Sequence, residues 1–431
     1  MLDLTLNLIK FVDVHLGIKL IEFVEEKKLY NANDLLNAKL TLLKKTKLLE
    51  KRNDVYQKLH AKPDPEFEKS KKVLGSAVAE LKASTDVFEE IFQDEQAMAD
   101  LKNEKVSAVQ FLMKDFDLKS ENISNLYKYA ALLYQSGDYV AAAQFFDYFR
   151  QLSTDFELCS SALWGKLNSE ILAGNNEKAF SDFLLLKESI EQTSSLQYSH
   201  LQQLENRTWL LHAALFVLLS HPKNGKDTLI DLFFQPQYIN TIQTSCPWIL
   251  RYLTLTVVTN KKRKNMLKDL VKILKQEHHV FSDPITDVLE CIFLDYNFEK
   301  AQVKLLEGEK VLESDYFLHP FLNEFLNQAK ILIFETYCRI YQNIGIKSLS
   351  EKLNFDEIEG EKWIVNVIRD ARMDAKIDAK TKTVIMGTQS QTIYQQVIEK
   401  TKSLSFKSSM LAANIEKKEQ EIACRNQEIN A

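Results

Sequence analysis

Glycine and proline are scarce throughout this chain, and their scarcity constrains its fold more than any other feature. The 431 residues contain only 10 glycines and 7 prolines, about 4% together, whereas soluble proteins usually contain about 12%. Glycine supplies left-handed backbone conformations and proline fixes turns, so a chain with few of both has few tight turns. The sequence therefore predicts long helices with short connections and argues against a sandwich or barrel.

A repeated pattern in the middle of the chain indicates a stack of helix pairs. Residues 137–146 (GDYVAAAQFF) align with residues 174–183 (GNNEKAFSDF) at an offset of 37 residues, and residues 296–305 (YNFEKAQVKL) follow the same pattern. Each segment predicts a turn and then a helix with a small residue where a neighbouring helix approaches closely. These small residues are Ala142, Ala179 and Ala301. A period in the mid-thirties is typical of tetratricopeptide-like (TPR-like) repeats, which stack into a superhelix with an extended surface for partners.

The regions that flank these repeats are also expected to be helical. Apolar residues recur at helical spacing within residues 1–60, which predicts three short amphipathic helices there. Two prolines among the charges of residues 60–70 predict a loop. Helical patterning returns in residues 71–118, and residues 200–345 continue as helices.

A winged helix is predicted near the C-terminus. Residues 347–387 predict a short helix, a turn, a longer helix over residues 356–369 and then a hairpin. The hairpin is expected because MDAKID alternates from Met373, AKTK turns and TVIM alternates again. A short hairpin at the end of a helical array leaves a strand edge that another chain's strand can extend. We therefore expect a partner protein at Met373, Ala375 and Ile377.

The charge of the longer helix in this winged helix argues against a surface that reads DNA or RNA. Residues 356–370 contain five acidic and two basic residues, a net charge of −3. Placing this helix in a phosphate-lined groove would bring like charges together, with no release of counterions to compensate. The whole chain has a net charge of −5, whereas nucleic-acid-binding domains are usually strongly basic. Pairing with another protein is the better interpretation.

A long amphipathic helix is predicted after the winged helix. Residues 394–421 contain neither glycine nor proline, and apolar residues recur every seven positions on an otherwise polar segment. The apolar residues of this stripe are Ile393, Val397, Leu404, Leu411 and Ile415. One apolar stripe on a polar helix predicts that the helix docks against a partner.

Composition predicts a soluble protein of a reducing compartment. Hydrophobic residues make up 45% of the chain and charged residues 27%, as in soluble globular proteins. Charges interrupt the first 26 residues, unlike a signal peptide, and the most apolar run, residues 209–220, is shorter than the roughly 20 residues of a membrane span. The five cysteines are scattered and predict free thiols: Cys159, Cys246, Cys291, Cys338 and Cys424. We expect a cytoplasmic protein.

No residue pattern predicts a catalytic, cofactor or metal site. The adjacent residues His278 and His279 diverge by about 100° on a helix, whereas a metal site needs three or four converging ligands. We expect an exposed helix end at this position. The motifs of nucleotide-binding loops, serine hydrolases and zinc proteases do not occur in the sequence. We therefore expect no enzymatic activity.

The one dense run of basic residues leaves three interpretations open. It consists of Lys261, Lys262, Arg263 and Lys264. Such a run could contact RNA, act as a nuclear import signal, or form a solvated loop between two helices.

The order of helical repeats, acidic winged helix and long helix resembles the PCI domain. PCI domains occur in scaffold subunits of the proteasome lid, the COP9 signalosome and translation initiation factor 3. Longer strings narrow the resemblance to the E-subunit family of eukaryotic translation initiation factor 3, over nearly the whole chain. They are SSALWGKL (160–167), QPQYINTIQTSCPWILRYL (235–253), DPITDVLECIF (283–293), IFETYCRI (333–340) and YQQVIEKTKSLSFKSSMLAANIEKK (394–418). The sequence departs from this family at residues 62–75, at residues 94–105 and after Lys418.

This resemblance implies a fold and a function. The fold is mainly α, a right-handed TPR-like solenoid that ends in a winged-helix PCI domain with a small hairpin, followed by a long C-terminal helix. The function is a non-catalytic scaffold that binds the 40S ribosomal subunit and helps to recruit mRNA. Its implied partners are other PCI and MPN subunits, which pair through winged helices and gather their C-terminal helices in one bundle. The stripe on residues 393–415 is this chain's expected share of that bundle.

Two alternatives remain at this point. The chain could be a PCI scaffold of the proteasome lid or the COP9 signalosome, or its winged helix could bind RNA directly. In every case the sequence divides into four regions: an N-terminal helical region (1–120), TPR-like repeats (121–345), the winged helix of the PCI domain (346–388), and the C-terminal amphipathic helix and tail (389–431).

Overall fold

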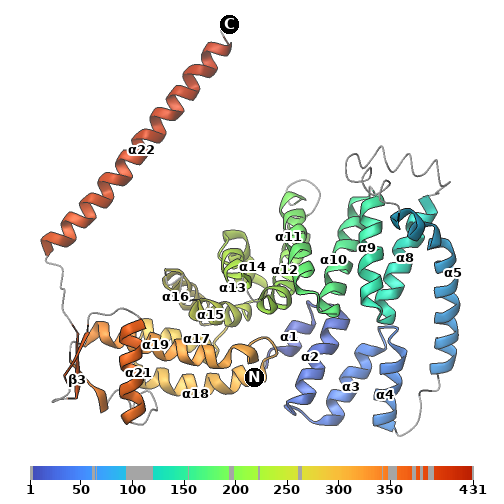
Figure 1. Cartoon of the computed structure of the whole chain (residues 1–431), viewed down its shortest axis with the longest axis horizontal. Coiled ribbons are helices and arrows are strands. Elements are labelled where there is room, and N and C mark those ends of the chain that lie inside the picture. Colours follow the sequence, from blue (N-terminus) through green and yellow to red (C-terminus); the bar gives the residue numbers. More distant parts are fainter. Residues whose placement is uncertain are drawn as a thin grey trace. The chain divides into compact units, whose positions relative to one another are not determined.

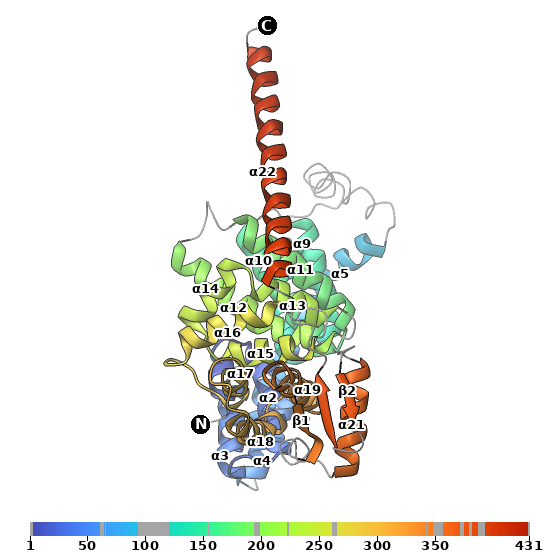
Figure 2. The same cartoon turned by 90° about the vertical axis from the view of Figure 1, so that its left-hand side faces the viewer.

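The computed structural model of this chain is almost entirely helical (Figures 1 and 2). It describes residues 3–60, 64, 66–93, 120–153, 155–193, 199–221, 224–260, 265–341, 343–347, 357–370, 375–378, 382–386 and 393–429. The chain forms two compact units, Met1–Phe334 and Glu335–Ala431. The prediction of a mainly α fold is confirmed.

The first unit is an array in which helices pack on their neighbours in the sequence. From α2 through α13, each described helix contacts the next described helix along the chain. The helices are α1 (Thr5–Ile9), α2 (Val14–Glu26), α3 (Ala32–Leu43), α4 (Leu49–His60), α5 (Phe67–Gln93), α8 (Ser120–Ser136), α9 (Tyr139–Leu152), α10 (Phe156–Ala173), α11 (Asn176–Thr193), α12 (His200–Ser220), α13 (Gly225–Phe233), α14 (Pro236–Ser245), α15 (Ile249–Thr259), α16 (Met266–Glu277), α17 (Pro284–Phe293), α18 (Phe298–Ser314), the short η2 (His319–Phe321) and α19 (Leu322–Ile340), which continues into the second unit.

The repeated sequence pattern corresponds to a repeated packing arrangement. The three small residues Ala142, Ala179 and Ala301 are at most 1% exposed, so each lies where the predicted close approach occurs. Two of the segments begin with a glycine whose φ is positive, Gly137 at 102° and Gly174 at 83°. Only glycine adopts this backbone region without strain, so these residues end one helix and allow the next to begin.

The described part of residues 1–60 contains four helices where the sequence predicted three. Asp13 divides the first apolar pattern, because its backbone is extended and its carboxylate accepts a hydrogen bond from the His15 amide at 2.9 Å. This is the arrangement of a helix N-cap, so a new helix must begin at Val14. The helical pattern of the side chains continues across the break, which is why periodicity did not reveal it.

The break at Asp13 is fixed by contacts with the repeats. The Tyr134 hydroxyl on α8 donates a hydrogen bond to Asp13 Oδ2 at 2.5 Å, and His15 Nδ1 lies 3.1 Å from the Tyr139 hydroxyl on α9. Burial and the Asp13 charge both raise the pKa of Tyr134, so this hydroxyl remains a donor. These bonds join α2 to helices more than 100 residues away, and they hold the preceding residues in one position.

The second unit contains a helix, a three-stranded sheet and a long terminal helix. The elements are β1 (Asn343–Gly345), α21 (Glu357–Asp370), β2 (Ala375–Asp378), β3 (Thr383–Met386) and α22 (Ile393–Ile429). β2 and β3 pair antiparallel, which confirms the predicted hairpin, and β1 pairs antiparallel with the other side of β3. The short helix predicted at residues 348–353 lies outside the described residues.

β3 is the central strand of the sheet, and the core of this unit lies against it. The strand order is β1–β3–β2. Val384 of β3 is fully buried and lies opposite Ile344 on one side and Ile377 on the other. Ile364 and Val367 of α21 are also buried. The unit thus has the helix-and-hairpin composition of the predicted winged helix, with one strand more than expected.

The four proposed regions and the handedness of the superhelix stay predictions.

Among the described residues, no helix combines the length and the apolar character that crossing a membrane would require.

Candidate protein-docking surfaces

α22 exposes every side chain that the structure describes along it. The five residues of the predicted stripe are between 56% and 78% exposed: Ile393, Val397, Leu404, Leu411 and Ile415. At 3.6 residues per turn, these five lie within a sector about 40° wide. Four further large apolar side chains are exposed on the rest of the helix: Tyr394, Ile398, Phe406 and Met410. An exposed apolar surface of this length is typical of a contact site.

The edge of β2 is a second candidate surface. Among the described residues, β2 pairs only with β3, so the other side of its backbone has no strand partner. Ala375 and Ile377 lie opposite Met386 and Val384, and directly paired residues place their side chains on the same face of a sheet. Both are half-buried, so their side chains pack on the side of Val384 and the backbone forms the edge. Met373 lies outside the described residues.

The exposed surface of α21 carries mixed charge. Its exposed residues among those described include Glu361, Lys362 and Arg369, while Trp363 is half-buried. Both signs of charge occur on this surface, so it lacks the single-sign field that concentrates phosphate groups. The basic run 261–264 lies outside the described residues, so its contact with RNA stays a prediction.

His278 belongs to a small cluster of polar residues at the end of α16. One ligand atom from each of His278, Asp287 and Glu290 lies within 4.8 Å of the others. These groups already have partners within the chain: His278 Nδ1 lies 2.8 Å from Glu290 Oε2, and Lys304 Nζ lies 3.4 Å from Asp287 Oδ2. The His278 side chain is 56% exposed, as predicted for a helix end. The cluster is a surface ion-pair network, and we propose no metal there.

A buried ion cluster that the sequence analysis missed joins three helices. Arg251 on α15 contacts Asp283 through two hydrogen bonds of 2.6 and 3.0 Å and contacts Asp315 at 3.3 Å. The Tyr252 hydroxyl donates to Asp315 Oδ2 at 3.0 Å. Burial opposes the guanidinium charge, but the two carboxylates outweigh it and raise the pKa of Arg251. Because Asp283 precedes α17 and Asp315 follows α18, the cluster fixes both ends of that helix pair against α15.

His212 is another buried polar residue with both ring nitrogens in use. Its Nδ1 lies 2.7 Å from the Thr208 carbonyl oxygen, and the Trp248 indole N–H donates to its Nε2 at 3.2 Å. The neutral ring with hydrogen on Nδ1 satisfies both bonds, whereas a protonated ring would oppose the Trp248 donor. Burial lowers the pKa of His212 to about 4.

The low pKa of His212 predicts that stability falls on acidification. Because the unfolded chain binds this proton near pH 6.5, the contribution of the neutral ring is complete above that pH and is lost as pH falls toward 4. Between pH 7.5 and pH 5.0, the free energy of unfolding should fall by about 2 kcal/mol more in the parent chain than in His212→Gln. Urea unfolding at both pH values measures the difference. An equal fall in both chains would contradict the assignment.

This chain contains a PCI domain, which places it in the class of PCI-domain proteins. The PCI domain family matches residues 290–388. Two other family models match the flanking regions: the "eIF3 subunit 6 N terminal domain" at residues 3–132 and the C-terminal region of the E subunit of eukaryotic translation initiation factor 3 at residues 392–412. The last match covers the stripe from Ile393 to Leu411.

Curated relatives narrow this class to one family. The E subunit of eukaryotic translation initiation factor 3 from Aspergillus clavatus is 42% identical over 416 residues, which cover 94% of this chain and 91% of the relative. The E subunits from Sclerotinia sclerotiorum and Botryotinia fuckeliana are 40% and 41% identical, each with 96% of this chain and 93% of the relative covered. The chain belongs to the E-subunit family of eukaryotic translation initiation factor 3. The resemblance found in the sequence is confirmed, and the relatives favour neither the proteasome lid nor the COP9 signalosome.

Proposed function

We propose that this chain is a non-catalytic scaffold subunit of translation initiation factor 3. Its relatives are named as the E subunit of that factor. The observation that carries the scaffold role is α22, a 37-residue helix with an exposed apolar stripe. A helix of this kind gains most of its stability from packing against other elements, so the stripe needs a partner to cover it.

The stripe docks into a bundle formed by helices of other subunits. Leu404 and Leu411 lie at its centre, one heptad apart, and Val397 lies one heptad before them. Residues seven apart remain on one face of a helix, so a second helix can contact all of them along a single seam. PCI and MPN subunits of the same factor supply these helices in the proposal.

The free edge of β2 provides a second contact. A strand from a neighbouring subunit adds to it through backbone hydrogen bonds, in the manner of β-augmentation. Lys376 is exposed between the half-buried Ala375 and Ile377, so a charged side chain marks the outer face of this strand. Its position discourages pairing with unrelated strands and leaves the backbone accessible to a specific one.

Beyond assembly, the proposed role of this chain is the role of initiation factor 3 as a whole, which acts in the cytoplasm. In this proposal the assembled factor binds the 40S ribosomal subunit and helps to recruit mRNA, and this chain contributes shape and contacts rather than a reaction. Residues 261–264 are the proposed point of local contact with RNA. The mixed charge of α21 supports pairing with protein over groove reading.

Affinity purification of the full chain from cell extract, followed by mass spectrometry, tests this proposal. We expect other subunits of initiation factor 3 to co-purify with the tagged chain in near-equal amounts. Co-purification of proteasome ATPases without those subunits would contradict the assignment. Recovery of the chain as a stable monomer would contradict the scaffold role itself.

A further inference from the structure

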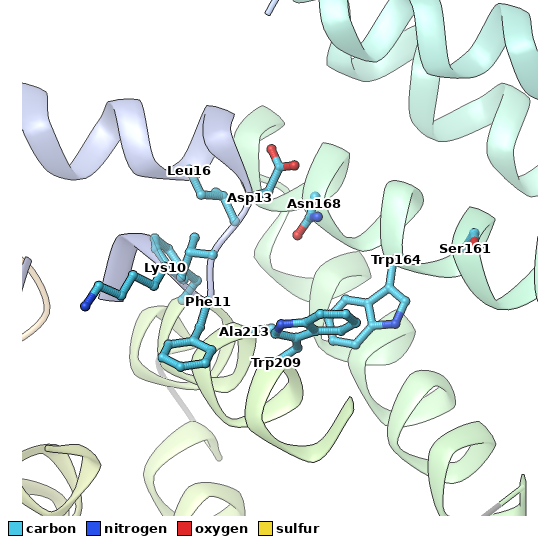
Figure 3. Close-up of a pocket in the computed structure, with 11 residues that line it drawn as sticks. Lys10, Phe11, Asp13, Leu16, Ser161, Trp164, Asn168, Trp209 and Ala213 are labelled. Carbon is cyan, nitrogen blue, oxygen red and sulfur yellow. The ribbon is translucent and has the colours of Figure 1, made fainter. Parts of the chain in front are cut away.

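A cavity of about 430 Å³ in the first unit has no role in the proposed assembly contacts. Figure 3 shows its lining, which comes from the turn after α1, from the start of α2, from α10 and from α12. On α10, Ser161, Trp164 and Asn168 lie on one face because they are three and four residues apart. The spacing of Trp209 and Ala213 places them together on α12 in the same way.

Two tryptophans give the cavity its character. The ring centroids of Trp164 and Trp209 lie 6.5 Å apart, and the ring planes are almost perpendicular, at 89°. Figure 3 shows the two indoles side by side, with Asn168 on one side of them and Phe11 on another. The Trp209 side chain is 43% exposed, which is a large accessible apolar surface for a tryptophan in a folded array. The pair forms an L-shaped apolar corner that solvent can reach.

The polar groups around this corner are not used by the protein itself. Within the described part of the chain, the two indole N–H groups, the Ser161 hydroxyl and the Asn168 amide have no hydrogen-bond partner. Asp13 is different, because its carboxylate already accepts bonds from the Tyr134 hydroxyl and the His15 amide. The cavity therefore offers several donors and one amide acceptor next to an apolar corner.

Among the described residues the lining holds one basic residue, Lys10, and one acidic residue, Asp13, whose carboxylate is hydrogen-bonded to Tyr134 and His15. Lys10 is exposed, and among the described residues it makes no ion pair. Figure 3 shows its side chain pointing away from the two indoles. Its ammonium group can therefore contact a part of a ligand that extends beyond the indoles. A ligand with an acidic group next to an apolar one matches this arrangement.

Two other ligand classes fit less well. A quaternary ammonium group needs several accessible ring faces, but the Phe11 ring stacks on His212 at a centroid distance of 4.9 Å, which leaves two accessible indoles and a positive charge nearby. A single-stranded nucleic acid needs a positively charged groove along its backbone, and the described residues of the lining include one basic side chain, Lys10.

We propose that this cavity binds an extended, proline-containing acidic segment of a partner protein. A proline ring packs flat against an indole, and a polyproline II segment has no internal hydrogen bonds. Its carbonyl oxygens therefore accept hydrogen bonds from the indole N–H groups and from Asn168. Aromatic-lined grooves recognise proline-rich segments in this way, and an acidic residue beside the proline pairs with Lys10.

This peptide site does not depend on the proposed assembly. The stripe on α22 and the cavity consist of different residues, so a chain that fails to join initiation factor 3 can still bind the peptide, and the reverse also holds. The two proposals can fail separately.

Selection from a random dodecapeptide library displayed on phage, with the immobilised full chain as bait, tests the proposal. The library is first depleted on the Trp209→Ala chain. We expect the retained peptides to be enriched in proline, with aspartate or glutamate one to three positions away. No peptide retained in a Trp209-dependent manner, or retained peptides without proline enrichment, would overturn the proposal.

Fluorescence anisotropy with the most enriched peptide then measures each contact. We expect Trp209→Ala and Lys10→Glu each to weaken binding at least tenfold, as should replacing the peptide's prolines with alanine. Leu201→Ala is the matched control, because Leu201 lies on α12, is 66% exposed and does not line the cavity. Equal binding by the Lys10→Glu chain and the parent chain would overturn the acidic preference. Because Lys10 is exposed, a loss of binding in this variant would not be explained by misfolding. Displacement of the peptide by oligouridylate at physiological salt would overturn the choice of peptide over nucleic acid.

Discussion

Replacing Leu404 and Leu411 with aspartate should release this chain from initiation factor 3 while the described elements from α1 to β3 keep their fold. Both leucines are more than 60% exposed in the separate chain, so the substitutions remove no contact that the fold needs. In the proposed docked state each leucine would be buried and would contribute roughly 1.5–3 kcal/mol. Each aspartate would add the cost of burying an unpaired charge. The two costs add, so we expect the docked helix to separate from its partners.

A matched double variant tests whether the effect depends on where the two charges are placed or only on their presence in the helix. Ser405→Asp and Ser409→Asp add the same two charges to the same helix, and both serines are exposed outside the stripe. On a sizing column the leucine variant should elute alone, and the serine variant should elute with the other subunits. If the leucine variant also elutes with them, the stripe is not the docking surface.

The parts of the structure that the sequence predicted depend on local spacing. The stripe on α22 was visible because a helix places every third or fourth residue on one face, whatever surrounds it. The alanine positions were visible for a related reason: only a small residue permits two helices to approach at Ala142 and Ala179, so the same residue recurs at each repeat.

The parts that it missed depend on residues that meet only after folding. β1 has three residues, too few to show alternation, and its Asn343 pairs with Ile385, which lies on β3 beyond the whole of α21. Trp164 and Trp209 form a corner only because α10 and α12 both contribute to the same cavity. Neither the separation of two residues along the chain nor the periodicity of the sequence predicts such tertiary contacts.

Arg251 shows which signal could have revealed a missed site. It is the one charged residue in α15 (ILRYLTLTVVT), and every residue of that helix is buried. A charge on a wholly buried helix requires a partner, because burying an isolated ion is very costly. The sequence thus indicated that an acidic residue must contact Arg251, but it did not identify Asp283 or Asp315, which lie 32 and 64 residues further on.

This ion cluster leads to the largest stability change that we expect in the chain. Asp283→Asn keeps the size of the side chain but removes its charge, and so removes one of the two carboxylates that Arg251 contacts among the described residues. Both Arg251 and Asp283 are at most 3% exposed. Breaking a buried ion pair by removing one partner costs about 3–5 kcal/mol. The free energy of unfolding, measured by urea denaturation at pH 7.5, should fall by about that amount.

A surface pair provides the control for this measurement. Lys272 and Asp269 lie 2.9 Å apart on α16, but their side chains are 74% and 57% exposed, and an exposed pair contributes about 0–1 kcal/mol. Asp269→Asn should therefore leave stability almost unchanged. Replacing Arg251 with methionine together with Asp283→Asn and Asp315→Asn should restore much of what Asp283→Asn alone loses, because the guanidinium and both carboxylates of the described cluster are then removed together. Equal effects of Asp283→Asn and Asp269→Asn would show that the buried cluster does not hold α17 and α18 against α15.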